Sequence, residues 1–299
     1  NYSYTVSYKK NTVPATREGH IVFSVMHSHE LMGKKSLACD TLTISQAPLY
    51  GKRTIHVGMS GELKKVVSEE EKNDITDLKI TGIIDHTEDL GYLNSFNSLV
   101  RLDLSEVYIV SMTEQLTSFY STIPDEAFRY SESTGTLKTL ITPESLIKLG
   151  NKALQFYELD SLVFHNEIQE IGQENRLGKK TFISNGNLKY VSKFNSNVEE
   201  LYITDLRAYC ETGFGAEDIY NTCYGGGFQP KRIYLNNELI TDLVIPAYIS
   251  QIRNNAFQNV ESITSVTFAD ETTYVGPWAF KDCKNLKEIK NYNSLSAIG

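Results

Sequence analysis

Apolar residues recur along this chain at a fixed interval. Near the C-terminal end, Leu243, Val266 and Ile289 follow one another at steps of 23 residues, and Phe257 and Phe280 are separated by the same step. Self-similarity at a period of about 20 to 50 residues is typical of a solenoid, in which each repeat buries its apolar face against its neighbours. The pattern therefore predicts a stack of similar coils.

One strand is expected in each coil, because the motif apolar-x-x-apolar-x-apolar returns from Ile75 onward. Side chains in a strand alternate between two faces, so the apolar ones turn inward and their neighbours outward. The motif occurs as Ile75/Leu78/Ile80, Leu99/Leu102/Leu104, Leu137/Leu140/Thr142, Leu159/Leu162/Phe164, Ile240/Leu243/Ile245 and Ile263/Val266/Phe268. We call the outward surface the ladder face. Its expected residues are Lys79, Asp103, Ile141, Val163, Tyr202, Tyr234, Val244, Thr267 and Lys290.

A second apolar position follows each strand and should begin the return side of the coil. It opens the phrase apolar-x-x-x-Ala-Phe/Leu, which runs over 123–128, 149–154, 252–257 and 275–280. Alanine suits a tight bend inside the coil, and phenylalanine can fill the space between adjacent coils.

Together these residues resemble the BspA-like leucine-rich repeats of bacterial surface proteins, whose unit reads roughly L-x-x-I-x-I-P-x-x-V-x-x-I-G-x-x-A-F-x-x-C. The resemblance implies a mainly β fold with short helices, an α/β right-handed solenoid over residues 75–299. Insertions are expected near 106–122, 173–186 and 205–231, where the period breaks. The sequence ends at Ile298-Gly299, inside a repeat phrase, so we expect more repeats or another domain in the full protein.

The first fifty residues follow a different pattern. Alternation of apolar and polar residues predicts strands at 4–8, 20–25 and 41–45. Residues 1–50 resemble the C-terminal part of a BACON domain, which implies a partial immunoglobulin-like β-sandwich. Residues 51–74 are expected to form a linker and a helix that caps the solenoid, with Leu63, Val66 and Val67 on its apolar side.

Composition excludes two classes of partner. The 29 basic and 37 acidic residues leave a net charge of −8 without a basic run, which argues against nucleic acid. No apolar stretch is long enough to insert into a membrane, although a lipid anchor in the full-length protein stays open. Four cysteines without a C-x-x-C pair give no zinc or redox motif. Cys210 and Cys223 form either a disulfide or two free thiols, and Cys283 falls on a core position of the repeat.

Catalysis has no recognisable residue set in this chain. We find no nucleophile with a base at fixed spacing, no carboxylate pair, and no phosphate loop at Gly225–Gly227. His27, His29 and Glu30 are better explained as a polar hairpin tip than as a metal site. The prediction is a non-catalytic protein with no metal and no cofactor.

Binding is the function that the remaining features favour. The segment from Tyr202 to Tyr234 breaks the repeat and is rich in rings, which on a rigid scaffold are typical material for a binding surface. The alternative is that the rings cover the core of a wide coil. The candidate ligand-binding residues are Tyr202, Tyr209, Phe214, Tyr220, Tyr224, Phe228 and Tyr234, with Val163 and His165 on the ladder face.

The resemblance implies an extracellular protein on a bacterial cell surface that binds or adheres to a host protein, a matrix protein or a glycan. Two alternatives stay open. A carbohydrate-binding accessory of a polysaccharide-utilisation system requires rings exposed side by side in one plane. A structural spacer requires that the rings be buried.

Overall fold

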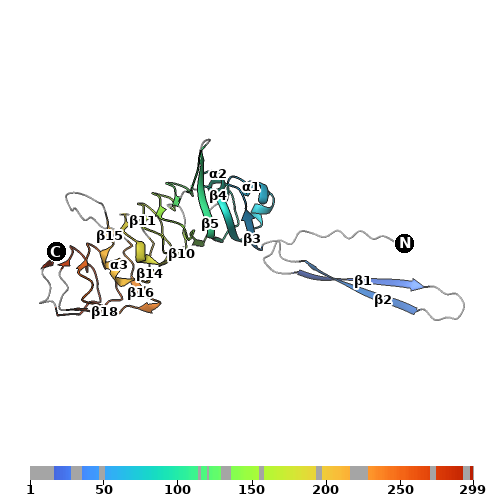
Figure 1. The fold of residues 1–299 in the computed structure, drawn as a ribbon. Coiled ribbons are helices and arrows are strands. Elements are labelled where there is room, and N and C mark those ends of the chain that lie inside the picture. The colour runs from blue at the N-terminus through green and yellow to red at the C-terminus, as the bar shows by residue number, and fades with distance from the viewer. Residues whose placement is uncertain are drawn as a thin grey trace.

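The computed structural model describes residues 17–27, 36–46, 51–113, 116–119, 121–128, 136–154, 158–192, 197–215, 228–269, 274–291 and 297–298. From residue 51 onward the chain forms coils stacked along one axis, with strands on two sides and few short helices (Figure 1). The fold is a mainly β solenoid, as the repeat pattern predicts.

The ladder sheet occupies one side of the stack. Its strand order is β17-β16-β14-β12-β10-β8-β5-β4-β3, and β6 pairs with β5. Neighbours from β3 to β16 are parallel, whereas β17 and β6 pair antiparallel with β16 and β5. The strands are β3 (Lys52–Val57), β4 (Asp77–Asp85), β5 (Arg101–Thr113), β6 (Leu116–Phe119), β8 (Thr139–Ile141), β10 (Ser161–Phe164), β12 (Lys180–Ile183), β14 (Glu200–Ile203), β16 (Arg232–Leu235) and β17 (Glu238–Leu239).

The return side of each coil carries a second, shorter set of parallel strands. It consists of β7 (Thr122–Ile123), β9 (Lys148–Leu149), β11 (Glu170–Ile171), β13 (Tyr190–Val191) and β15 (Gly213–Phe214). The last coils form two further sheets, β18 (Asp242–Ile245), β20 (Ser265–Phe268) and β22 (Glu288–Lys290), and β19 (Gln251–Ile252), β21 (Tyr274–Val275) and β23 (Ala297–Ile298). Leu243 pairs with Val266 and Val266 with Ile289, which confirms the 23-residue period.

The core is the column of inward residues that this pairing stacks. Leu140 in β8, Leu162 in β10 and Leu201 in β14 are fully buried at equivalent positions of the ladder sheet. The Ala-Phe phrase behaves as expected, since Ala256 and Phe257 are buried and the ring of Phe257 stacks on Phe280 at 5.3 Å. Burial of each such side chain contributes about 1.5 to 3 kcal/mol, so the stacked columns supply most of the stability.

Coils approach one another closely at the corner that opens the Ala-Phe phrase. A Cβ atom added to Gly172 would lie 2.7 Å from the backbone nitrogen of Asn151, and one added to Gly150 would lie 2.5 Å from that of Asp125. The Gly172 amide donates to Leu149 O at 2.8 Å. Glycine is needed here because any side chain would strike the backbone of the preceding coil.

In five coils of the described part of the chain, the residue two positions after this corner has a left-handed backbone conformation. The φ angles are 55° at Glu126, 55° at Lys152, 58° at Glu174, 61° at Asn255 and 59° at Trp278. This conformation turns the amide toward the next coil: Glu126 N donates to Asn151 O at 2.9 Å and Lys152 N to Gln173 O at 2.9 Å. The hydrogen bond to the next coil offsets the backbone strain of a non-glycine residue in this region.

The N-terminal end of the stack differs from the predicted linker. Residues 52–57 form β3, a strand of the ladder sheet, and the capping elements are α1 (Leu63–Val66), the short 3-10 helix η1 (Glu71–Asn73) and α2 (Glu88–Leu93). Leu63 and Val67 are buried under this cap, as expected, but Val66 is 42% exposed because α1 ends there.

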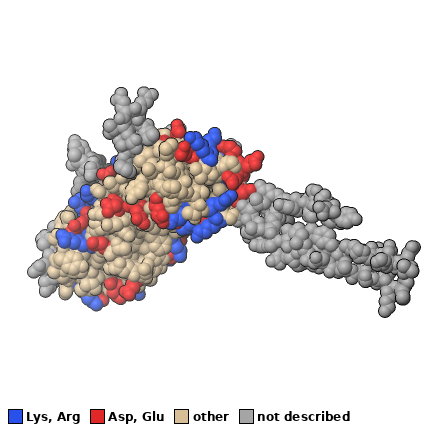
Figure 2. Space-filling view, turned by 45° about the vertical axis from the view of Figure 1, so that its right-hand side comes forward, with Lys and Arg blue, Asp and Glu red and all other residues tan. Residues whose placement is uncertain are grey.

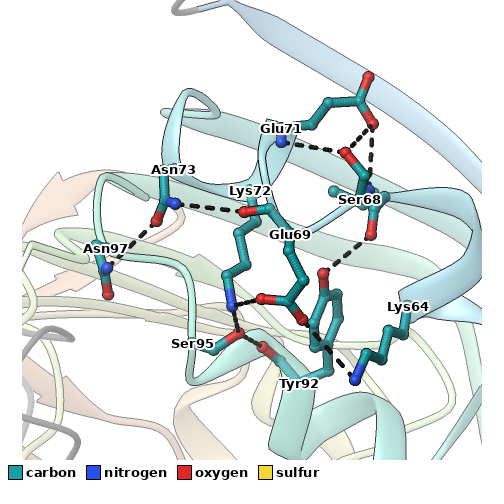
Figure 3. A network of polar contacts seen from close by, with 10 residues as sticks. Lys64, Ser68, Glu69, Glu71, Lys72, Asn73, Tyr92, Ser95 and Asn97 are labelled. Atoms are coloured by element: carbon teal, nitrogen blue, oxygen red, sulfur yellow. Dashed lines mark hydrogen bonds and ion pairs between the residues drawn. The ribbon is translucent and has the colours of Figure 1, made fainter.

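The elements of the cap are tied to one another by polar contacts as well as by packing (Figure 3). Lys72 pairs with Glu69, donates to Ser95 Oγ at 3.1 Å and lies 5.3 Å from the centroid of the Tyr92 ring. Tyr92 in turn donates its hydroxyl to Val67 O at 2.9 Å. Buried Asp89 accepts three backbone amides, from Gly61, Leu63 and Asp85, at 2.7 to 3.0 Å.

Two of the segments expected to be insertions contain strands of the ladder sheet. Residues 106–113 continue β5, which returns as β6. Residues 180–183, placed in an insertion by sequence, form β12 between β10 and β14. The coil that follows β14 is wider and contains α3 (Leu206–Glu211) and β15, while residues 216–227 lie outside the described part of the chain.

The N-terminal module is described only as a hairpin. Its strands are β1 (Arg17–His27) and β2 (Ser36–Gln46), paired antiparallel in a sheet of their own. They include the strands predicted at 20–25 and 41–45, whereas 4–8 lies outside the described residues. The structure does not show a BACON domain.

Replacing Gly172 with alanine should destabilise the solenoid by about 1 to 3 kcal/mol, because the new methyl group overlaps backbone that cannot move independently of its coil. Urea denaturation followed by circular dichroism measures this change. The matched control is Gly91→Ala in α2, where an added Cβ meets nothing within 4 Å and helix propensity predicts a gain of about 0.5 to 1 kcal/mol. Equal effects of the two substitutions would contradict the close-approach explanation.

Asp89→Asn should lower the free energy of unfolding by about 2 to 4 kcal/mol, because one carboxylate oxygen that accepts buried amides is exchanged for an NH₂ donor. Differential scanning calorimetry provides the measurement. The control is Asp74→Asn in the same cap, which removes the same charge at a position of intermediate burial. If Asp89→Asn melts at the wild-type temperature, the three amide contacts do not stabilise the cap.

Candidate functional site: the ladder face

Residues that are far apart in sequence line up in rows across the ladder face. Backbone pairing places Lys79, Asp103, Ile141, Val163, Phe182, Tyr202 and Tyr234 in one register from β4 to β16. We call this the central row. Its members alternate with buried neighbours in each strand, so their side chains turn outward. The middle of the row is apolar and aromatic, and its N-terminal end is charged.

Three rings of the central row stack on one another. The centroids of Phe182 and Tyr202 are 4.3 Å apart with an interplanar angle of 17°, and those of Tyr202 and Tyr234 are 4.4 Å apart at 9°. The spacing follows from the separation of hydrogen-bonded strands, about 4.8 Å. All three residues are half-buried. The ring faces that point toward one another are in contact, so the three rings do not lie side by side in one plane.

A charged row runs beside the stack, two residues earlier in each strand. Register aligns Lys180, Glu200 and Arg232. Glu200 lies between the two cations, 3.2 Å from Lys180 Nζ and 3.0 Å from Arg232 Nη2, and it also accepts the Tyr202 hydroxyl at 2.9 Å. One carboxylate thus holds two cations, and the row keeps a net positive charge next to the rings.

These contacts change how the groups titrate. Partial burial alone would raise the pKa of Glu200, but hydrogen bonds from Tyr202, Lys180 and Arg232 outweigh it and leave the pKa below its usual value. Burial, and then the bond to Glu200, raises the pKa of Tyr202 to about 12. Both groups therefore hold fixed protonation states at neutral pH, with Glu200 ionised and Tyr202 a hydrogen-bond donor.

The N-terminal end of the face has its own ion cluster. Arg101 lies 3.2 Å from Asp77 and 3.1 Å from Asp103, and Ser105 donates its hydroxyl to Asp103 at 2.7 Å. Although burial acts to raise the pKa of Asp103, the bonds from Ser105 and Arg101 lower it overall. Acidic and basic side chains intermingle between broad uncharged areas on the face shown in Figure 2.

The structure separates the predicted binding residues into groups. Tyr202, Tyr234 and Val163 lie on the ladder face as expected. His165 follows β10, is half-buried, and has no hydrogen-bond partner at Nε2 among the described residues. Tyr220 and Tyr224 lie outside the described residues.

Three predicted binding residues are core residues instead. Tyr209, Phe214 and Phe228 are exposed by only 1, 7 and 3%. The ring of Tyr209 packs 5.3 Å from Phe214 and 5.4 Å from Phe257, and its hydroxyl donates to Ala256 O at 2.7 Å. These rings fill the wide coil that follows β14, which was the alternative weighed from sequence. Their burial removes them from the candidate surface.

Phe182 is the site residue that sequence analysis missed. The inward position beside it is Thr181, a polar residue where the motif requires an apolar one. Thr181 is fully buried and satisfies its hydroxyl by donating to Gly178 O at 2.9 Å. The outward series Val163, Phe182, Tyr202, at steps of 19 and 20 residues, was the signal that could have found it.

The ladder face is also interrupted where sequence predicts continuity. After β16 the chain turns back through Asn236 and Asn237, both left-handed, into β17. Val244, Thr267 and Lys290 therefore share a register on a separate sheet, β18-β20-β22. The candidate surface is confined to the strands before β17.

A family model settles what kind of repeat this is. The BspA type leucine rich repeat region matches residues 108–203 and 230–299 in six copies, more than half of the chain. The chain belongs to the BspA-type leucine-rich repeat family. Its repeats thus combine the family's Ala-Phe phrase with the outward aromatic row described above.

Other comparisons add little to this assignment. No curated protein matches in sequence. The crystal structure of a leucine rich cell surface protein from Faecalibacterium prausnitzii A2-165 is 14% identical over 62% of this chain and 68% of that chain, with a TM-score of 0.20. A likeness at that TM-score does not extend to the geometry of the ladder face.

The cysteines of this BspA-type protein are structural where they are described. Cys283 is buried in the expected core position, donates to Phe257 O at 3.1 Å, and has its pKa raised to about 11 by burial. Cys210 is a fully buried free thiol whose pKa is also raised by burial, and Cys223 is outside the described residues. Within the described part of the chain, no three His, Cys, Asp or Glu residues gather as metal ligands, and no helix could span a membrane.

Acid should weaken the ladder face through Glu200 and Asp103. Both have folded-state pKa values below the usual range, so their stabilisation is present above the unfolded-state pKa and is lost as the pH falls through the folded one. The urea midpoint of the wild type should therefore fall between pH 7 and pH 3. The double variant Glu200→Gln/Asp103→Asn should lose less over that interval.

The control for this pH series is Glu238→Gln, an exposed residue of β17 without an ion pair among the described residues. It should follow the wild type. The explanation would be contradicted if the double variant kept the full acid sensitivity of the wild type.

Proposed function

We propose that this chain is a non-catalytic bacterial cell-surface protein that binds a protein partner through the ladder face, with Phe182, Tyr202 and Tyr234 at the centre of contact. Family membership and the likeness to a leucine rich cell surface protein support a surface location. The partner is expected to be a host or matrix protein.

The ring stack is the observation that carries this proposal. Half-exposed aromatic side chains beside a charged row supply apolar area together with polar groups, the combination found at the centres of protein interfaces. A fold of stacked coils does not need such a row on its outer surface, because its stability comes from the buried columns. The row therefore favours binding over the spacer function.

The same geometry favours a protein over a glycan at this face. Sugars stack on ring faces that lie side by side in one plane. Here the nearly parallel rings, with centroids 4.3 and 4.4 Å apart, cover the faces that they turn toward one another, so the rings do not lie side by side in one plane. Ring edges and hydroxyl groups suit the side chains and backbone of a protein partner.

Binding to an array of host and extracellular-matrix proteins and glycans tests the proposal. Wild-type protein should bind a protein component, and Tyr234→Ala or Phe182→Ala should weaken that binding by roughly 10- to 30-fold, corresponding to about 1.4 to 2 kcal/mol for a central contact. The matched control is Tyr274→Ala, which removes an exposed ring on β21, away from the ladder sheet.

Thermal melting of each variant establishes that the fold is retained. Undiminished protein binding by Tyr234→Ala and Phe182→Ala would overturn the proposed site. Binding confined to glycans and lost in these variants would instead support the carbohydrate-binding function.

A further inference from the structure

A second surface feature lies on the return side of the stack, away from the ladder sheet. A groove of about 410 Å³ is lined by residues of three successive coils, which we call the side groove. One wall is formed by η2 (Asn185–Asn187) and the residues after it, and the opposite wall by α3. Arg253, at the end of β19, closes the groove from the next coil, where its amide donates to Cys210 O at 2.8 Å.

The side groove concentrates positive charge on an acidic protein. Lys189, Arg207 and Arg253 line it together with Asp205 and Glu211, which leaves one net positive charge while the whole chain carries −8. Lys189, Arg207 and Arg253 are all exposed. An anion in the groove would therefore meet cations from three different coils.

The two acidic residues of the groove already have partners, whereas one of its cations has none. Asp205 Oδ1 accepts the Ala208 amide at 2.9 Å, and Glu211 accepts Arg207 Nε at 2.9 Å. Lys189 donates to Gln169 Oε1 at 2.8 Å and forms no ion pair with any residue that the structure describes. The Arg253 guanidinium makes no hydrogen bond or ion pair with the part of the chain that the structure describes. Arg253 is thus the cation available to a ligand.

The mixture of acidic and basic side chains in the side groove restricts the charge of a ligand that can bind there. A phosphate group would face the carboxylates of Asp205 and Glu211 with more than one negative charge, which is unfavourable. A single carboxylate needs only the guanidinium of Arg253 and the ammonium of Lys189. Hydroxyl groups on the same molecule can donate to the remaining carboxylate oxygens of the groove. A ligand with one carboxylate and several hydroxyl groups satisfies both kinds of residue.

An exposed tyrosine contributes to the electrostatics of Arg207. Tyr248 is 64% exposed, and the pKa of Arg207 is raised first by the hydrogen bond and charge of Glu211, and further by Asp205 and Tyr248.

We propose that the side groove binds a carboxylated sugar unit, such as a uronic or sialic acid residue of a glycan, with its carboxylate held by Arg253 and Lys189. This site is independent of the protein-binding role proposed for the ladder face, and the two can succeed or fail separately.

The test is calorimetric titration of the whole chain with sodium D-glucuronate at low salt, in parallel with D-glucose and with N-acetyl-L-glutamine, which carries one carboxylate and no sugar. Glucuronate should bind saturably, glucose should not, and N-acetyl-L-glutamine should bind more weakly than glucuronate. Raising the salt concentration should weaken the binding.

Three variants locate the binding. Arg253→Gln should weaken glucuronate binding by roughly 10-fold or more, the loss expected for one hydrogen-bonded charge, and Lys189→Gln should also weaken it. The matched control Lys287→Gln removes an exposed cation that does not line the groove and should bind like the wild type. Because Arg253 has no described side-chain partner, its replacement should leave the melting temperature unchanged.

Each remaining outcome overturns the proposal. Absence of saturable glucuronate binding shows that the groove is not a site for sugar acids. Equal binding of glucose would show that the carboxylate is not recognised, equal binding of N-acetyl-L-glutamine would show that the sugar is not recognised, and unchanged binding by Arg253→Gln would show that the ligand does not bind in the groove.

Discussion

Parallel backbone pairing between one coil and the next is the constraint on which the rest of this structure depends. A coil touches only its neighbours, so each must match the register of the previous one along the ladder sheet and along the return strands. At the corner between these two sides, the coils approach so closely that Gly150 and Gly172 have no room for a side chain. Register, spacing and handedness of the backbone are thus set repeatedly at the same place in each coil.

The surface properties follow from this pairing. Because equivalent residues are held about 4.8 Å apart, side chains at one outward position form a continuous row, whatever lies between them in sequence. Rings at three successive positions must then stack, as Phe182, Tyr202 and Tyr234 do at 4.3 and 4.4 Å. Charged residues two positions earlier form a parallel row in which Glu200 bridges Lys180 and Arg232. The ladder face combines these two rows without distorting the coils that carry them.

The side groove arises from a departure from the regular coil. After β14 the chain forms α3, and the interior beside it is filled by Tyr209, whose hydroxyl donates to Ala256 O in the next coil. Widening one coil displaces its outer surface relative to its neighbours. The groove between η2, α3 and Arg253 is the external result of that displacement.

Sequence by itself determined the solenoid, its 23-residue C-terminal period, the inward columns and the Ala-Phe phrase, because each of these is a local pattern repeated at fixed spacing. It also placed Val163, Tyr202 and Tyr234 on the outward face by simple alternation. Tertiary structure alone decided the rest. Thr181 is a buried polar residue with an internal hydrogen bond, so the apolar motif of the other strands is missing from β12. Sequence analysis therefore did not identify β12 or the outward residue Phe182. Aromatic residues occur both at binding surfaces and in cores, so the sequence could not assign Tyr209, Phe214 and Phe228. The shape of the wide coil places them in the core. The side groove joins residues 186 to 253, whose proximity depends on how three coils stack and has no counterpart in the linear sequence.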